Sequence, residues 1–427
     1  MTVITRAKEA FKVIASYNQE RVDNLCRAIC AAFYPLKVWG ALCDETVNET
    51  GLGDKVSKLD KRNELRLILR DCLRNKTVGI IEENPAKMLV KYARPVGVIA
   101  AFIPATDPCF VTVSQALYAV KARDVLICSA DKKAVKITNK TVNIIRDVLT
   151  REGATADIVQ AADGQEFTEG ADLVFTNDSA SRNSLTIIDE TINNKERLRE
   201  AAVNTRISRC FDFGAGTSSN DNLAIHEKVY DEFLYELVKE GAYIPKWKEV
   251  EKLKRVIWDE EGQRLQDTVA ISPQALAKRA GFSIQSELKF IAVPNNGQKT
   301  GFTIDNSDDI KKCIGPEHFF SRKKSTPLLT LFKYGGEFQT ALEITSAIFN
   351  EAKGNCGLYS FDDEHIHSLG LCSAVERCLI RKARYEHDDN ALNNYINTTL
   401  VERPVAEDVP SLKELFGEFY GEELEKE

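Results

Sequence analysis

The sequence of 427 residues contains 11 cysteines but lacks closely spaced pairs of them. No CxxC or CxxH motif occurs, so the pattern offers neither a zinc site nor a secreted disulfide framework. No stretch reaches the roughly 18 apolar residues that a membrane-spanning helix needs, and residues 1–20 lack the uninterrupted apolar core of a signal peptide. We therefore expect a cytoplasmic protein without a membrane segment, whose cysteines are reduced and mostly buried.

The chain also lacks any block of basic residues. Its 57 lysines and arginines stand against 64 aspartates and glutamates, which leaves a net charge of −7. This balance disfavours nucleic acid as a partner, because nucleic-acid binding draws on clustered positive charge. Apolar residues form 43% and charged residues 28% of the chain, proportions typical of a folded globular protein. At about 150 residues per domain, the length predicts two or three domains.

Apolar patterning divides the chain into two α/β regions. Residues 1–75 follow helical spacing, and from position 94 onward strands and helices alternate. The first region has four short apolar runs of strand length, at 95–104, 125–129, 156–160 and 171–175. Helical patterns between them argue for a parallel sheet with right-handed crossovers. We expect three segments: a helical lead-in and first domain at 1–205, a second α/β domain at 206–375, and a return segment with an acidic tail at 376–427.

Residues 76–136, which include PVGVIAAFIPATDPCF, resemble the CoA-acylating aldehyde dehydrogenases, including the dehydrogenase half of bifunctional aldehyde-alcohol dehydrogenases. The stretches 209–243, 275–293 and 325–344 are similar to the same family, in the same order along the chain. The resemblance implies a Rossmann-like cofactor domain with an interleaved α/β catalytic domain. It also implies NAD(P) and CoA as cofactors, no metal, and assembly as a homo-oligomer or as a hetero-oligomer with an active paralogue.

Several motifs of this family can be matched to the chain, but the residues at their key positions differ from those of the family. In the family, a cysteine thiolate attacks the aldehyde, and an asparagine amide with a backbone N–H stabilises the oxyanion that forms. Matching the motifs puts Thr217 of FDFGAGT at the cysteine position and Asp107 of ATDP at the asparagine position. Lys323 of RKKSTP stands where the family has a glutamate, and the Thr-Gly-Gly turn after 171–175 is absent.

These differences leave two hypotheses open. The leading one is a divergent homologue that lacks the nucleophilic cysteine, a pseudoenzyme with a structural, accessory-subunit or ligand-binding role. The alternative is an active NAD(P)-dependent enzyme with a relocated thiol, either Cys210 or Cys109. Pro104, Thr106 and Ser129 favour the alternative, because they stand at strand ends where the family faces its cofactor.

Overall fold

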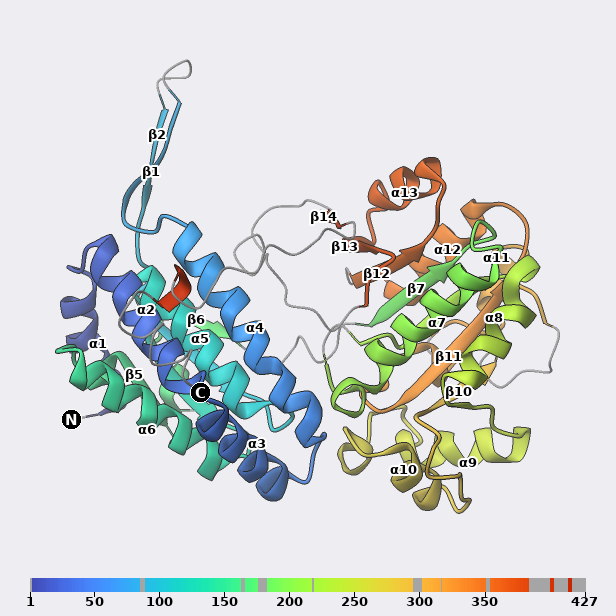
Figure 1. Cartoon of the computed structure of the whole chain (residues 1–427), viewed down its shortest axis with the longest axis horizontal. Coiled ribbons are helices and arrows are strands. Elements are labelled where there is room, and N and C mark those ends of the chain that lie inside the picture. Colours follow the sequence, from blue (N-terminus) through green and yellow to red (C-terminus); the bar gives the residue numbers. More distant parts are fainter. Residues whose placement is uncertain are drawn as a thin grey trace. The chain divides into compact units, whose positions relative to one another are not determined.

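The computed structural model forms two compact units, which are described separately (Figure 1). It describes residues 2–84, 89–162, 166–175, 183–216, 219–294, 302–315, 317–350, 354–383, 400–402 and 414–416. The first unit contains the described residues up to 175 and a short helical turn at 414–416. The second unit contains those from 183 to 383 and the strand at 400–402.

Four helices open the first unit, as the spacing of apolar residues predicts. Their bounds are α1 Val3–Ile14, α2 Gln19–Phe33, α3 Leu36–Thr50 and α4 Lys55–Arg74. Side chains of Thr2, Asn18 and Asp54 accept hydrogen bonds from the first turns of α1, α2 and α4, so each of these helices begins at a polar N-cap. A hairpin of β1 Gly79–Asn84 and β2 Leu89–Ala93 follows and projects from the unit (Figure 1).

The first unit's sheet has the strand order β5-β4-β3-β6, and all its pairs are parallel. The strands are β3 Val98–Ile103, β4 Val125–Ala130, β5 Val159–Ala162 and β6 Leu173–Phe175, and the crossover helices are α5 Pro108–Ala122 and α6 Val135–Arg151. Short 3-10 turns lie at Ala156–Ile158 and Glu166–Thr168. Helices α2, α3 and α4 pack against α5, and α1 contacts the sheet. The predicted α/β architecture is therefore confirmed.

The first strand of this sheet, β3, lies in its interior, and later strands are added on both sides of it. It proceeds from β3 to β4 and β5 on one side, then returns to β6 on the other side of β3. Such a reversal of strand order is a topological switch point, and ligands of open parallel sheets bind outside the carboxyl ends of the strands there. The sheet thus points to the residues that follow Ile103.

The second unit is built on an eight-stranded parallel sheet, in the order β14-β13-β12-β7-β8-β11-β10-β9. Its strands are β7 Ser184–Ile188, β8 Asn222–His226, β9 Ala242–Tyr243, β10 Phe290–Pro294, β11 Leu328–Tyr334, β12 Gly354–Tyr359, β13 Val375–Ile380 and β14 Leu400–Glu402. Its helices are α7 Lys195–Cys210, α8 Glu227–Lys239, α9 Trp247–Ile257, α10 Pro273–Arg279, α11 Ser307–Lys311, α12 Phe338–Phe349 and α13 Asp363–Gly370. Among its described residues, 3-10 turns lie at Phe211–Gly214, Gln266–Thr268 and Phe319–Ser321.

Neighbouring residues of β7 pack into different cores of the second unit. Ile187 belongs to the core that α12 covers, whereas Ile188 belongs to the core that α7 and α8 cover. Successive side chains of a strand point to opposite faces, so this sheet is covered on both sides.

The boundary between the units lies nearer the amino terminus than the sequence analysis places it. The first unit ends at Asn177 and not at 205, because β7 and α7 belong to the second unit's sheet and core. The segment 376–427 is also divided, since β13 and β14 pair in the second unit while Leu415 and Phe416 are buried in the first.

Membrane-spanning character is weak in the described part of the chain. No single described helix is long and apolar enough to cross a bilayer. Among the described helices, only α2 and α3 together have the length and composition of a membrane-spanning segment, and this pair is bent by 69°. Residues of α2 such as Leu25 and Ile29 are fully buried within the first unit, as expected of core helices.

Two carboxylates hold the start of β3 in place. Asp124 accepts the N–H of Gly97 at 2.8 Å, and Asp172 accepts the N–H of Val98 at 2.7 Å. Gly97 has a φ of +132°, and a Cβ there would overlap the Asp172 carboxylate, so only glycine fits. Burial raises the pKa of Asp124 to about 6 in spite of its backbone hydrogen bonds.

This raised pKa makes the contribution of Asp124 to stability depend on pH. Between about pH 4 and pH 6, the folded state binds a proton that the unfolded state has released, so stability falls as pH rises. We expect the unfolding free energy of the wild type, minus that of Asp124→Asn, to decrease by roughly 3 kcal/mol across this window. Urea denaturation of both proteins at several pH values measures the difference, and a constant difference would contradict the assignment.

Candidate active site

The candidate cofactor residues stand at the carboxyl ends of β3 and β4, beside the switch point. Pro104 and Thr106 follow β3 and are half-buried, and Ser129 lies near the end of β4 and is buried. Parallel strands bring their carboxyl ends to the same edge of a sheet, and Phe102 pairs with Ser129 in the register of β3 and β4. The structure therefore gathers these predicted residues at one edge.

Asp107 follows Thr106 and is the N-cap residue of α5. Its side chain makes no capping hydrogen bond to the helix. It forms instead a buried ion pair with Lys61 of α4, whose ammonium donates to the carboxylate. One turn away, the ammonium of Lys58 donates to the carbonyl of Thr106 at 2.6 Å. Two lysines of α4 thus hold the loop between β3 and α5.

Neither lysine was identified from the sequence, although a signal was present. Lys58 and Lys61 are in register with Leu65 and Ile68, which form the apolar stripe of α4. A helix turns once every 3.6 residues, so all four side chains share one face. A lysine within such a stripe is rarely buried without a partner, and this pattern could have predicted an ion pair.

Cys109 lies in the first turn of α5, where it is buried. Its sulfur contacts the hydroxyl oxygens of Thr46 at 3.3 Å and of Thr141 at 3.4 Å. Burial raises the pKa of the Cys109 thiol to about 11, although hydrogen bonds from Thr141 and Thr46 lower it. The nucleophile in thiol chemistry is the thiolate, so this environment disfavours Cys109 in that role.

Cys210 is the last residue of α7 and the other candidate thiol. It is half-buried, and its Sγ lies 3.5 Å from the carbonyl oxygen of Lys289. The chain then makes a tight turn in which Asp212 and Phe213 have φ values of +48° and +51°. Thr217, three residues beyond the turn, lies outside the described residues.

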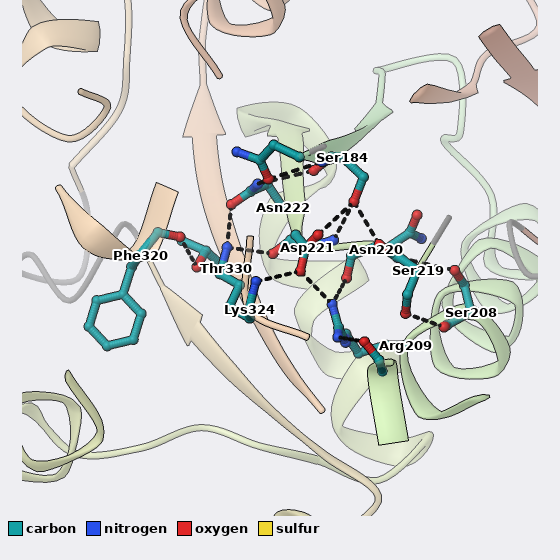
Figure 2. A network of polar contacts seen from close by, with 12 residues as sticks. Ser184, Ser208, Arg209, Ser219, Asn220, Asp221, Asn222, Phe320, Lys324 and Thr330 are labelled. Atoms are coloured by element: carbon teal, nitrogen blue, oxygen red, sulfur yellow. Dashed lines mark hydrogen bonds and ion pairs between the residues drawn. The ribbon is translucent and has the colours of Figure 1, made fainter. Parts of the chain in front are cut away.

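Arg209 ties this turn to the start of β8 (Figure 2). Its guanidinium donates to the carbonyl of Gly214 at 2.9 Å and to that of Asn220 at 2.5 Å. It also forms a fully buried ion pair with Asp221 at 2.9 Å. A Cβ at Gly214 would overlap the guanidinium, and its φ of +74° also favours glycine. Arg209 therefore joins Gly214 at the end of the turn to Asn220 and Asp221 at the start of β8.

Lys324 lies on the other side of Asp221 from Arg209 and belongs to the same hydrogen-bond network (Figure 2). Its ammonium donates to the carbonyl of Asp221 at 2.8 Å and to Oδ1 of Asn222 at 2.6 Å. Burial lowers the pKa of Lys324 well below its usual value, against the charge of Asp221. Burial would raise the pKa of Asp221, but the charges of Arg209, Lys323 and Lys324 outweigh it and lower that pKa.

Lys323, the residue predicted at the glutamate position, is half-buried beside this network. Its charge acts on Asp221, whereas Lys324 makes the buried hydrogen bonds. The sequence analysis missed Arg209, Asp221 and Lys324, since nothing in one sequence tells which charges of a loop become buried. Among the described residues, no group of three or more His, Cys, Asp or Glu side chains is arranged to hold a metal ion.

Breaking the buried pair should be costly. We expect Arg209→Met to lower the unfolding free energy by about 3–5 kcal/mol, because Asp221 is then left buried without its guanidinium partner. Lys55→Met is the control, since Lys55 pairs with Asp44 at the surface and its loss should cost less than about 1 kcal/mol. Urea denaturation compares the two, and equal losses would show that the network does not hold the loop.

The sequence is similar to curated acylating dehydrogenases along most of its length. It is 27% identical to a sulfoacetaldehyde dehydrogenase of an Acholeplasma species over 430 residues, which cover 94% of this chain and 84% of that protein. It is also 27% identical to the succinate-semialdehyde dehydrogenase (acetylating) of Clostridium kluyveri, over 93% of this chain and 88% of that protein. No family model matches the sequence. The relatives are described as enzymes, so the expectation of a homologue without a nucleophilic cysteine finds no support in them.

Solved structures of the same kind share the fold. An acetylating aldehyde dehydrogenase from Geobacillus thermoglucosidasius matches with a TM-score of 0.76 and 22% identity, over 90% of this chain and 86% of that one. A Rhodopseudomonas palustris propionaldehyde dehydrogenase with bound propionyl-CoA matches with a TM-score of 0.73 and 17% identity, over 90% and 85%. An engineered glycolyl-CoA reductase with bound NADP+ also matches with 0.73 and 17%, over 90% and 87%. The chain thus has the α/β fold of the acylating aldehyde dehydrogenases and is similar to them in sequence along nearly its whole length.

Proposed function

We propose that the protein is an NAD(P)-dependent aldehyde dehydrogenase that passes the acyl group to coenzyme A. The observation that carries the proposal is the similarity, over more than nine tenths of the chain, to a sulfoacetaldehyde dehydrogenase and to a succinate-semialdehyde dehydrogenase named as acetylating. The edge formed by Pro104, Thr106 and Ser129 supports it, because it lies at the switch point of a parallel sheet.

The residues at this edge fit a nicotinamide dinucleotide. Pro104 and Thr106 leave β3 just before the amino end of α5, a helix of 15 residues whose N-terminal dipole favours an anionic group. A related structure is described with NADP+ and another with propionyl-CoA. When bound, NAD(P)+ would accept a hydride from the aldehyde carbon, and the CoA thiol would take up the acyl group.

Cys210 is the thiol that we propose as nucleophile. Nine of the 11 cysteines are buried, and only Cys210 and Cys372 are half-buried. Cys210 directly precedes the turn that Arg209 holds, whereas Cys372 follows α13. In the proposed step, the thiolate of Cys210 forms a bond to the aldehyde carbon, and the carbonyl electron pair moves onto the oxygen. The electron pair on oxygen then re-forms the carbonyl and expels hydride, which bound NAD(P)+ would accept, so that a thioester is left on Cys210.

The names of two relatives suggest the substrates to test. Sulfoacetaldehyde and succinate semialdehyde each join an aldehyde to an anionic group. A short aldehyde of this class is the substrate that we propose. Of the three cations in this network, Lys323 is the half-buried one, and its charge suits an anionic substrate; Arg209 and Lys324 are buried and bonded to Asp221 and Asn222.

A second candidate function is favoured by one specific observation. Motif matching places Thr217 at the nucleophile position, and a hydroxyl has a far higher pKa than a thiol. A homologue of this kind would bind NAD(P) or CoA as a ligand-binding protein or as an accessory subunit of an active paralogue. Binding without turnover is its distinguishing property.

A turnover assay tests both candidates. We expect the purified protein to form reduced nicotinamide from sulfoacetaldehyde or succinate semialdehyde, CoA and NAD+ or NADP+. Cys210→Ala should lower kcat at least about 1,000-fold, since the covalent step is lost. Cys372→Ala is the matched control, because it removes the other half-buried thiol and should leave kcat unchanged.

Other outcomes would redirect the proposal. Full activity in Cys210→Ala would exclude Cys210 as nucleophile, and loss of activity in Thr217→Ala alone would point to the residue at the family's position. No turnover, together with a rise in melting temperature on adding NADP+ or CoA, would support the second candidate.

A further inference from the structure

The second unit's sheet has a switch point of its own, at the carboxyl ends of its strands. The chain enters this sheet at β7, adds β8 on one side and later adds β12 on the other. Ligands of open parallel sheets bind outside the carboxyl ends of the strands at such a point. The proposed function assigns no role to the residues that follow β7, β12 and β13 at this edge.

Two arginines meet at this edge over one aromatic ring. Arg197 lies in the first turn of α7, and Arg381 directly follows β13. Their guanidinium carbons lie 3.7 and 4.2 Å from the centre of the ring of Phe361, which follows β12 and is 41% exposed. Cation–π contacts of this kind hold a guanidinium against a ring. The two positive charges are therefore no farther apart than these two distances together.

A buried network fixes the ring and one of the guanidiniums. The carbonyl of Thr191 accepts a hydrogen bond from the guanidinium of Arg197 at 3.0 Å, and the hydroxyl of Thr191 accepts the N–H of Phe361 at 2.8 Å. This hydroxyl in turn donates to the fully buried carboxylate of Asp189 at 2.6 Å. The other oxygen of Asp189 lies 2.8 Å from Nδ1 of His365. The arrangement thus exists before any ligand binds, which lowers the entropic cost of binding.

The charges of the two arginines are not balanced. Among the described residues, neither guanidinium forms an ion pair with a carboxylate, and Nε of Arg381 is buried without a hydrogen-bond partner. Arg197 also stands at the amino end of a helix, where the dipole favours an anion over a cation. The neighbouring Asp362 is engaged as the N-cap of α13, where it accepts the N–H of Glu364 at 2.8 Å. A bound anion would therefore stabilise this edge.

The backbone of Arg381 is strained as well. Its φ of +52° lies in the left-handed region, which residues other than glycine rarely adopt. Strain of this kind clusters at ligand sites, where the surrounding structure holds a residue in place for binding. The conformation of Arg381 and the missing counter-charge are separate observations, and both indicate a ligand at the same guanidinium pair.

We propose that Arg197 and Arg381, held against Phe361, bind a small molecule through its phosphate group. A phosphate monoester carries roughly 1.5–2 negative charges at pH 7, which matches two guanidiniums. Arginine also binds phosphate oxygens through paired N–H groups. The site is independent of the proposed function, because Arg197 is about 20 Å along α7 from Cys210 and the phosphate does not contact the proposed nucleophile.

Isothermal titration calorimetry of the full chain with inorganic phosphate and with AMP tests the site. We expect saturable binding to the wild type, and a dissociation constant at least about tenfold higher for Arg197→Met and for Arg381→Asn, because each variant loses charge-assisted hydrogen bonds. Asparagine is chosen at 381 because it tolerates a left-handed backbone. Binding of AMP at the first unit's sheet would persist in both variants, so only the affinity that they lose reports on this site.

Arg206→Met is the matched control. Arg206 lies on the same helix, but it already pairs with Glu240 at 2.7 Å, so its loss should leave phosphate binding unchanged. Arg197→Lys replaces Arg197→Met if the latter does not fold, because lysine keeps the charge but lacks the paired N–H groups.

The outcomes separate the possible ligands from failure of the site. A tighter affinity for AMP than for inorganic phosphate, lost in both variants, would identify a nucleotide as the ligand, and equal affinities would show recognition of the phosphate group alone. A wild type without saturable phosphate binding would overturn the site, and so would equal binding by the wild type and both variants. An equally tight affinity for succinate would overturn the assignment to phosphate. These measurements need no turnover, so a failure of the proposed function leaves them unaffected.

Discussion

A buried charge must have a partner, and this constraint shapes both candidate loops of the protein. In the first unit, the carboxylate of Asp107 is paired with Lys61 at the end of β3. In the second, Asp221 is paired with Arg209 and hydrogen-bonded to the backbone of Lys324 before β8 begins. Each loop is held by charged side chains from other parts of the sequence. The position of its candidate site residues therefore depends on how those parts of the chain pack together.

The sequence predicted the scaffold better than the site. Apolar runs such as VLICS at 125–129 mark buried strands without further information, and the structure has β4 at Val125–Ala130. Pro104, Thr106 and Ser129 were placed correctly at strand ends because strand position determines that edge. Lys61 and Arg209 were missed, because their partners lie 46 and 12 residues away and only the folded chain brings them together. The unit boundary was misplaced for a related reason, since α7 reads as a helix but its sequence does not show which core it joins.

The cysteines show how burial separates residues that sequence analysis treats alike. Cys210 and Cys109 were both candidates as relocated nucleophiles, with Cys210 as the main one. The structure places Cys109 in the first unit's core, with a pKa of about 11, and leaves Cys210 half-buried beside a fixed turn. This difference in burial cannot be predicted from a single sequence, because both cysteines have apolar and polar neighbours in the chain.

The left-handed turn at 212–214 stores conformational strain next to the buried ion pair of Arg209 and Asp221. Asp212 and Phe213 lack the freedom of glycine, and a left-handed conformation costs each of them roughly 1–2 kcal/mol. The guanidinium of Arg209 joins the carbonyl of Gly214 at the end of this turn to the carboxylate of Asp221 before β8, and so supports the strained backbone. Replacing Arg209 would therefore release conformational strain as well as leave a buried carboxylate without its partner.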